Sequence, residues 1–191
     1  AFVASGAEAG YPGNTDFNGT KQEGFGRYQF TIRNGRRWST AAAYLKPVLS
    51  RPNLTIETGA LTQRVLFEND RAVGVQYARG NRETVVHAER EVILSGGVVN
   101  SPQLLMLSGI GPADDMESLG IVTIIDRPDV GSNLQDHLCV HTVHKSKTRT
   151  LTDELVRLER GAVSVARAFL TRSGPASAFP LEGGAFIRTS D

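Results

Sequence analysis

Residues 88–111 constrain the fold of this chain more than any other stretch. The sequence passes from a charged turn into a short aliphatic block at 92–94 and then into Ser95, Gly96 and Gly97. Such a block is typical of a strand buried on both faces in a parallel sheet. The glycines lack side chains, so the backbone can turn sharply there or approach a ligand closely. We therefore predict a strand that leads into a glycine turn.

The second half of this stretch predicts a helix. Asn100 or Ser101 can serve as its N-cap, and Pro102 suits the first helical position. The helix covers residues 103–107, and the glycine-rich segment 108–111 ends it. A strand, a glycine turn and a helix N-terminus together bind phosphate-bearing cofactors in α/β folds. From spacing alone an ordinary strand–helix joint stays open, because one such turn is a weak signal.

The rest of the chain predicts a mixture of strands and helices. Alternating apolar and polar residues predict strands, including a hairpin, whereas amphipathic spacing predicts helices. We expect strands at residues 28–32, 54–58, 64–67, 72–77, 83–87, 121–125, 139–145 and 182–188, and helices at 40–49, 112–119 and 153–170. The predicted fold class is α/β or α+β, with a β-meander that leads into residue 92.

Composition excludes several classes of function. The 191 residues include Lys+Arg 21 and Asp+Glu 20, a formal net charge of +1, which gives no electrostatic case for nucleic acid. No apolar run approaches the ~18–20 residues of a membrane span. The single cysteine, Cys139, excludes an internal disulfide framework. No carboxylate or cysteine cluster joins His137, His141 and His144, so we expect no metal site.

Several segments, in order, resemble one known family. Residues 95–111, SGGVVNSPQLLMLSGIG, resemble the second signature of the glucose–methanol–choline (GMC) flavoprotein oxidoreductases. Residues 131–137, GSNLQDH, resemble the family's Gly-x-Asn-Leu-x-Asp-His loop, and residues 34–41 and 51–54 resemble its upstream segment. Together with EGGAFIR at 182–188, these segments resemble the choline-dehydrogenase-like branch of the family, which includes related bacterial alcohol dehydrogenases.

The resemblance implies an FAD-dependent alcohol dehydrogenase. In this chemistry a base takes the hydroxyl proton of choline or a related primary alcohol, hydride passes to the flavin N5, and the protein supplies placement. The resemblance also implies part of an FAD-binding Rossmann-like domain and the beginning of a mixed-sheet substrate-binding domain. We expect residues 1–38 to be a loop and strand segment linked to the substrate domain, 39–138 to belong to the FAD domain, and 139–191 to the substrate domain.

Two functional parts of the family are missing from this sequence. No Gly-x-Gly-x-x-Gly fingerprint occurs, and none of the four histidines matches the family's catalytic position. We therefore expect the central segment of a longer enzyme, inactive alone and without a catalytic residue of its own. A non-catalytic binding or scaffold module derived from the same fold is the alternative. The missing fingerprint also argues against a nicotinamide-binding domain.

The resemblance assigns cofactor contacts to four residues. Thr62 matches a strand residue, typically Val, whose backbone N–H and C=O pair with the adenine edge of FAD. Such pairing tolerates the exchange because the side chain makes no contact. Ser95, Gly96 and Gly97 match the turn beside the adenosine and pyrophosphate, where the backbone can pack closely against ribose and phosphate. A plain strand threonine and an ordinary turn are the structural alternatives.

Glu182 is the candidate substrate residue. It matches a carboxylate that, in choline-oxidising relatives, holds the quaternary ammonium by Coulomb attraction beside aromatic rings. An ordinary strand glutamate is the alternative. The sequence decides neither the alcohol, nor the electron acceptor, nor the oligomeric state. It is compatible with a cytoplasmic or a peripherally membrane-associated enzyme.

Overall fold

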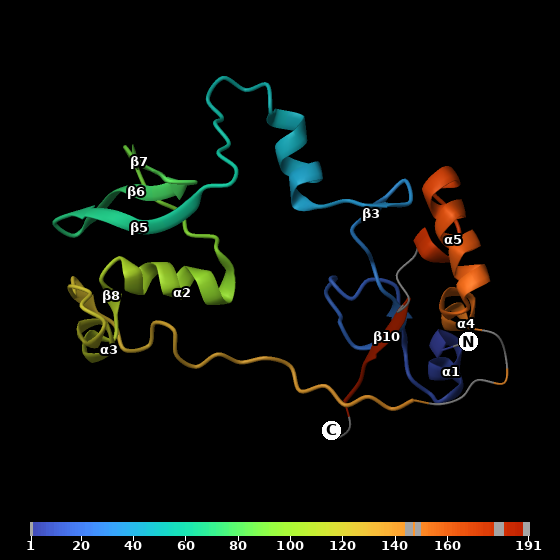
Figure 1. Ribbon diagram of the computed structural model, residues 1–191. Helices are drawn as coiled ribbons and strands as arrows, with labels where there is room; N and C mark the ends of the chain where they lie inside the picture. Colours follow the sequence, from blue (N-terminus) through green and yellow to red (C-terminus); the bar gives the residue numbers. More distant parts are fainter. Residues whose placement is uncertain (1, 144–146, 148–149, 178–181, 189–191) are drawn as a thin grey trace. The chain divides into compact units, whose positions relative to one another are not determined.

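The computed structural model describes residues 2–143, 147, 150–177 and 182–188 (Figure 1). The chain divides into two compact units. One contains residues 1–54 and 142–191, and the other contains residues 55–141. The predicted domain boundaries concern the complete enzyme and stay a prediction.

A three-stranded antiparallel meander is the centre of the second unit. Its strands are β5 (Leu61–Glu68), β6 (Arg71–Arg79) and β7 (Arg82–His87), in the order β5-β6-β7. Alternation places Val65 in the core, opposite Val75 of β6. The predicted hairpin and the predicted strand at 83–87 are thereby confirmed.

A helix and a small parallel sheet complete this unit. Helix α2 (Gly97–Leu107) leads to β8 (Ile110–Gly111), which pairs in parallel with β9 (Ile125–Asp126) across helix α3 (Ala113–Ser118). The predicted helix at 112–119 is confirmed, whereas the predicted strand at 121–125 is reduced to its last residue. Met116 of α3 is 1% exposed and is the most deeply buried large side chain among the described residues.

The strand predicted at 92–94 is wrong. Residues 91–95 form no ladder with any described strand. Their aliphatic side chains satisfy the pattern of a buried parallel strand, but strand hydrogen bonds must come from a neighbour distant in sequence, and the described residues supply none. The strand predicted at 54–58 is absent for the same reason.

Helix α2 also starts earlier than predicted. It begins at Gly97, with Gly96 as N-cap, and Pro102 lies inside the helix. Pro102 is the sixth of the eleven residues of α2, so the helix loses the hydrogen bond that an N–H at this position would donate, and it continues to Leu107 without that bond. Ser101 does not cap the helix; its hydroxyl accepts a hydrogen bond from the backbone N–H of Gly96 at 3.0 Å. The side chain thus closes the turn in front of α2.

A buried serine fastens α2 to the meander. The Ser108 hydroxyl accepts from the backbone N–H of Val65 at 2.8 Å and donates to the carbonyl of Leu104. Ser108 is 6% exposed, so a lost partner would not be replaced by water. These two bonds connect the edge of β5 to the end of α2.

Replacing Ser108 with alanine should therefore destabilise the full-length protein by about 1–3 kcal/mol, because the Val65 N–H is left buried without an acceptor. The measurement is urea-induced unfolding. Ser118→Ala is the matched control, since the Ser118 hydroxyl donates to the carbonyl of Asp115 at an exposed position. Ser118→Ala should lower the free energy of unfolding by less than about 0.5 kcal/mol. Equal losses for both variants would contradict the role assigned to Ser108.

The first unit contains a mixed three-stranded sheet. Its strands are β1 (Gly13–Asn14), β2 (Gly24–Arg27) and β10 (Gly183–Phe186); β1 runs parallel and β10 antiparallel to β2. Helix α1 (Phe2–Glu8) contacts this sheet. The predicted strand at 182–188 is confirmed over its centre.

The strand predicted at 28–32 is displaced. The ladder occupies residues 24–27 instead, and a separate hairpin follows with β3 (Ile32–Arg33) and β4 (Arg36–Arg37). Gly26 explains the shift, because an added Cβ there would meet the carbonyl oxygen of Asn14. The close approach of β1 and β2 therefore needs glycine in the strand.

The helices of the first unit are shorter than predicted. A π-helical turn η1 (Ala41–Leu45) and a 3₁₀ turn η2 (Lys46–Val48) replace the helix at 40–49, as Pro47 interrupts the pattern. The helix at 153–170 is two helices, α4 (Leu151–Val156) and α5 (Leu158–Thr171), followed by the 3₁₀ turn η3 (Pro175–Ser177). Residues 139–143 of the predicted strand at 139–145 form no strand, and residues 144 and 145 lie outside the described residues.

Candidate cofactor-binding cleft

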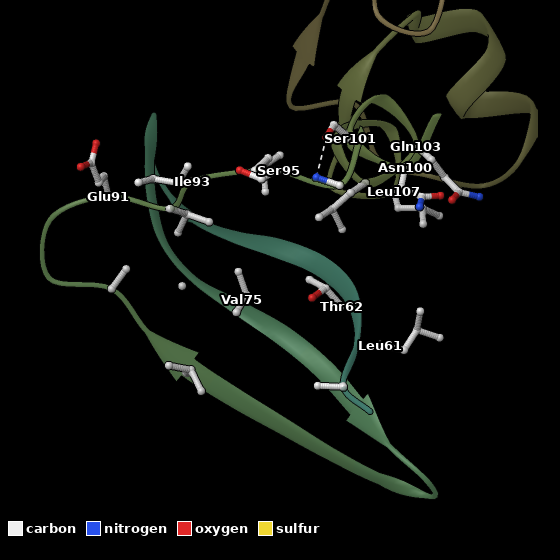
Figure 2. A pocket seen from close by; sticks show the side chains of 18 of the residues that line it. Leu61, Thr62, Val75, Glu91, Ile93, Ser95, Asn100, Ser101, Gln103 and Leu107 are labelled. Carbon is white, nitrogen blue, oxygen red and sulfur yellow. Dashed lines mark hydrogen bonds between the residues drawn. The ribbon is translucent and has the colours of Figure 1, made fainter. Parts of the chain in front are cut away.

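A cleft of about 680 Å³ lies in the second unit. Its walls are the meander on one side and, on the other, residues 91–96 with the part of α2 from Asn100 to Leu107 (Figure 2). This volume falls within the ~300–1,000 Å³ that small-molecule sites commonly have. Three of the four predicted cofactor residues, Thr62, Ser95 and Gly96, line the cleft. Gly97 follows directly, as the first residue of α2.

The hydrogen bonds of β6 show which way the backbone of β5 faces. The backbone N–H of Val65 donates to the Ser108 hydroxyl, so the N–H and C=O of Val65 point away from β6. Opposed residues of an antiparallel pair either exchange hydrogen bonds or both point away. Val75, opposite Val65, therefore directs its backbone groups toward β7. Tyr77 lies two residues further along an unbroken register with β7 and does the same.

Thr62 consequently faces the free edge of the sheet. It lies opposite Tyr77, whose backbone groups point to β7, so the N–H and C=O of Thr62 point away from β6. A β-bulge makes this geometry, since the register shifts between Thr62 and Arg64. Without the bulge, strict alternation from Val65 would have directed the N–H and C=O of Thr62 toward β6. The edge strand thus offers one donor and one acceptor at Thr62, which lines the cleft (Figure 2).

The turn of Ser95 and Gly96 lines the cleft, and the N-terminus of α2 follows directly after it. The first four N–H groups of a helix lack intrahelical acceptors, and the helix dipole gives them positive character. Gly97 has a φ of 86°, a conformation that favours glycine. Apart from the neighbouring residues and the backbone of the helix itself, no atom lies within 4 Å of the position that a Cβ on Gly97 would take, so the space in front of α2 is open. An anionic group can approach this backbone without meeting a side chain.

Sequence reasoning missed the wall that faces the glycine turn. The missed residues are contributed by β6, β7 and the side of α2, and include Val75, Val86, Asn100 and Gln103. The signal that could have found them is Gly74, which lies in β6 opposite His87. An added Cβ there would meet the carbonyl oxygen of Val86. A glycine inside an alternating strand marks such a close approach.

Glu182 lies in the other unit, next to the mixed sheet. The N–H of Tyr28 donates to the Glu182 carbonyl at 3.0 Å, which extends the β2–β10 register by one pair. Glu182, Gly184 and Phe186 therefore share one face. The rings of Phe17 and Tyr28 are 5.5 Å apart, and those of Phe17 and Phe186 are 5.1 Å apart. Glu182 is exposed and adjoins this aromatic cluster.

The remaining candidates give a simpler picture. His137 donates its backbone N–H to the carboxylate of Asp136 at 2.7 Å in an exposed segment. Within the described ranges, no three His, Cys, Asp or Glu side chains are grouped so that they could hold a metal ion. No helix in the described part of the chain has the length and apolar character needed to cross a membrane.

Comparison with known proteins identifies the class to which the cleft belongs. Residues 1–139 match the GMC oxidoreductase family. The chain therefore belongs to the GMC oxidoreductases. Membership confirms the predicted family, which is a family of oxidoreductases.

Two curated relatives are choline dehydrogenases. The chain is 48% identical over 190 residues to the mitochondrial choline dehydrogenase of Mus musculus, an alignment that covers 99% of this chain and 32% of the relative. It is 44% identical over 190 residues to the oxygen-dependent choline dehydrogenase of Brucella anthropi, covering 99% of this chain and 34% of that relative. The chain thus spans about a third of the length of the curated relatives it matches.

A solved structure supports the fold and the cofactor class. It is a variant of the formate oxidase of Aspergillus oryzae, determined to see the effect of the mutation on FAD modification. Its similarity to this chain has a TM-score of 0.82 at 30% identity and covers 97% of this chain and 33% of that one. The mixed α/β fold class and FAD as the cofactor of the class are confirmed.

Proposed function

We propose that this chain is the central segment of an FAD-dependent dehydrogenase that oxidises choline or a related primary alcohol to the aldehyde. One observation carries the proposal: the outward-facing backbone of Thr62 and the Ser95–Gly96 turn directly before α2 border the same cleft. When bound, FAD supplies the oxidation chemistry by accepting hydride. This chain supplies placement of the adenosine and pyrophosphate end.

The edge of β5 would hold the adenine ring. An adenine edge carries a donor and an acceptor side by side, which match the C=O and N–H of one edge-strand residue. Thr62 offers these two groups because the bulge turns them toward the free edge. The aliphatic side chains of Val75 and Val86 line the same cleft and suit an aromatic ring.

The turn before α2 would hold the pyrophosphate. Ser95 and Gly96 line the cleft, and Gly97 follows directly as the first residue of α2. The uncompensated N–H groups and the helix dipole favour an anion at this place. Because Ser101 already accepts from the Gly96 N–H, the turn keeps its shape without the ligand.

Glu182 would hold the cationic end of the substrate. A quaternary ammonium cannot donate hydrogen bonds, so it is recognised by a fixed negative charge and aromatic faces. Glu182 supplies the negative charge, and the adjoining cluster of Phe17, Tyr28 and Phe186 in the same unit supplies the aromatic faces. The choline dehydrogenases among its relatives favour choline as the first substrate to test.

A pair of substitutions at Thr62 tests the backbone role. Thr62→Pro removes the N–H and should weaken FAD binding by the full-length enzyme about tenfold, the equivalent of ~1.4 kcal/mol. Thr62→Val keeps the N–H and the β-branched shape, so FAD affinity should stay within about twofold. Flavin fluorescence titration of the deflavinated enzyme is the measurement. A loss with valine as large as with proline would assign the contact to the side chain instead.

The activity itself is tested on the full-length protein. Bound flavin together with choline turnover by an artificial electron acceptor would support the dehydrogenase, whereas flavin-free protein without turnover would support the scaffold module. The 191-residue chain alone should show no turnover, because neither the dinucleotide fingerprint nor the family's catalytic histidine is in it.

A further inference from the structure

Two glycines face each other in the middle of the mixed sheet. Gly26 of β2 lies directly opposite Gly184 of β10, and opposed residues of an antiparallel pair direct their side chains to the same face. Tyr28 and Glu182 form the next pair on that face, because the register extends to them. The face of the sheet that carries Glu182 therefore has no side chain at its centre.

Aromatic rings occupy the space that the two glycines leave open. A Cβ on Gly184 would meet the hydroxyl and the ring of Tyr28, and a Cβ on Gly26 would lie 3.0 Å from the ring of Phe17. Tyr28 is the diagonal neighbour of Gly184 in the ladder, a position that an aromatic side chain can reach. The ring of Tyr28 therefore lies against the backbone of β10, next to Glu182 in the ladder.

The loop before β2 holds the Phe17 ring against Tyr28. The Asp16 carboxylate accepts hydrogen bonds from the backbone N–H of Asn18 at 2.9 Å and from the side-chain amide of Gln29 at 3.2 Å. The amide of Asn18 donates in turn to the side-chain oxygen of Gln29 at 3.3 Å. Gln29 follows Tyr28 directly, so the loop that carries Phe17 is fastened beside the Tyr28 ring. Contacts within this unit thus fix the position of both rings.

We propose that Gly184 is a specificity-determining residue of the substrate site, because it lets the Tyr28 ring lie low enough beside Glu182 for a quaternary ammonium group to contact both. The inference rests on the role proposed for Glu182. Positively charged methyl groups without N–H donors are attracted to the face of an aromatic ring. A primary ammonium group is strongly hydrated and donates its own hydrogen bonds to a carboxylate, so it depends less on the ring. The height of the ring therefore selects N-methylated amino alcohols over unmethylated ones.

Alanine at position 184 would displace the Tyr28 ring and leave the sheet intact. The three atoms nearest to the added Cβ all belong to the Tyr28 side chain, which can rotate away. The φ of Gly184 lies outside the left-handed region, so alanine adopts it without strain. Gly26 does not allow such a test, because a Cβ there would also meet the carbonyl oxygen of Asn14.

Inhibition of choline turnover by two small cations tests the inference on the full-length enzyme. Tetramethylammonium has the charge and the methyl groups of a quaternary substrate, whereas methylammonium has the same charge and carries N–H donors. In Gly184→Ala the inhibition constant of tetramethylammonium should rise about fivefold, and that of methylammonium less than about twofold. Gly13→Ala is the matched control and should change neither constant. It replaces another strand glycine of this sheet, where no atom apart from the neighbouring residues lies within 4 Å of the added Cβ.

Tyr28→Val shows whether Gly184 acts through the ring. Valine keeps a β-branched residue in the ladder and is too short to reach its diagonal neighbour. Alone, it should raise the constant of tetramethylammonium selectively, which decides the question if Gly184→Ala folds poorly. Adding Gly184→Ala to Tyr28→Val should then have no further effect. A further fivefold rise in that background, or equal rises for both cations in Gly184→Ala, would overturn the proposal.

Glu182→Gln separates this inference from the proposed function. The substitution should raise the inhibition constants of both cations, because both are attracted by the carboxylate. If Glu182→Gln changes neither constant, the proposed role of Glu182 is wrong. If it raises both constants while Gly184→Ala and Tyr28→Val raise neither, the role of Glu182 holds and only the inference about Gly184 is wrong.

Discussion

Replacing Gly97 with alanine is expected to lower the FAD affinity of the full-length enzyme about tenfold or more. Gly97 has a φ of 86°, a conformation that costs a residue with a Cβ about 1–2 kcal/mol. The local packing adds nothing to this cost, since no atom lies within 4 Å of the added Cβ. The methyl group would occupy the open space in front of α2, where we place the pyrophosphate. Relief of the strain would also turn the first N–H groups of α2 away from the cleft.

Gly120→Ala separates strain from ligand contact. Gly120 has a φ of 73° and likewise no atom within 4 Å of an added Cβ, but it follows α3 outside the cleft. Both variants should lose a similar amount of unfolding free energy, and only Gly97→Ala should lose FAD affinity. Fluorescence titration and urea unfolding of both variants make the comparison. If FAD affinity falls equally in the two, the glycine turn has only a structural role.

Local patterns were sufficient for the part of the fold that depends on local contacts. The meander β5–β7 was predicted because its alternating strands and the turn around Asn69, which has a φ of 53°, depend on residues that are close in sequence. At the start of the helix predicted at 40–49, the Ser39 hydroxyl likewise accepts a hydrogen bond from the backbone N–H of Ala42, three residues later. In both cases the partners of each backbone group are close in sequence.

Sequence patterns gave wrong predictions where the hydrogen-bond partner of a backbone group is distant in sequence or is not among the described residues. The aliphatic residues 92–94 match a buried strand, but no described strand pairs with them. The start of α2 was misplaced because proline favours the first turn statistically, whereas Gly97 begins the helix here. The bulge before Arg64 has no signature in alternation, because it adds a residue that breaks the period.

The bulge shows how much the candidate site depends on such a detail. Resemblance to the family pointed to Thr62, but only the register of three strands shows that its backbone groups face the free edge. Removing one residue from the bulge would turn Thr62 toward β6 and leave the edge without its donor and acceptor. The identity of the side chain contributes little to this geometry. A departure from the usual valine is therefore compatible with the proposed role.

Replacing Glu182 with glutamine is expected to raise the KM for choline at least about tenfold while changing the KM for an uncharged primary alcohol little. The substitution keeps the shape of the side chain and removes its charge. Two unit charges about 4 Å apart at an effective dielectric constant of about 20 attract by ~4 kcal/mol, and the exposure of Glu182 reduces this in water. A remaining difference of ~1.4 kcal/mol corresponds to tenfold. Since the carboxylate binds ground state and transition state alike, kcat should change less than KM.

Glu8→Gln is the matched control for this measurement. Glu8 is an exposed glutamate at the end of α1 in the same unit, so its substitution removes the same charge at a place away from the aromatic cluster. Long-range effects of net charge should be equal in the two variants and should disappear as salt is raised. A KM for choline that rises only with Glu182→Gln, and only for the cationic substrate, would support direct contact with the ammonium group. An equal rise for charged and uncharged alcohols would mean that Glu182 shapes the strand and does not recognise the cation.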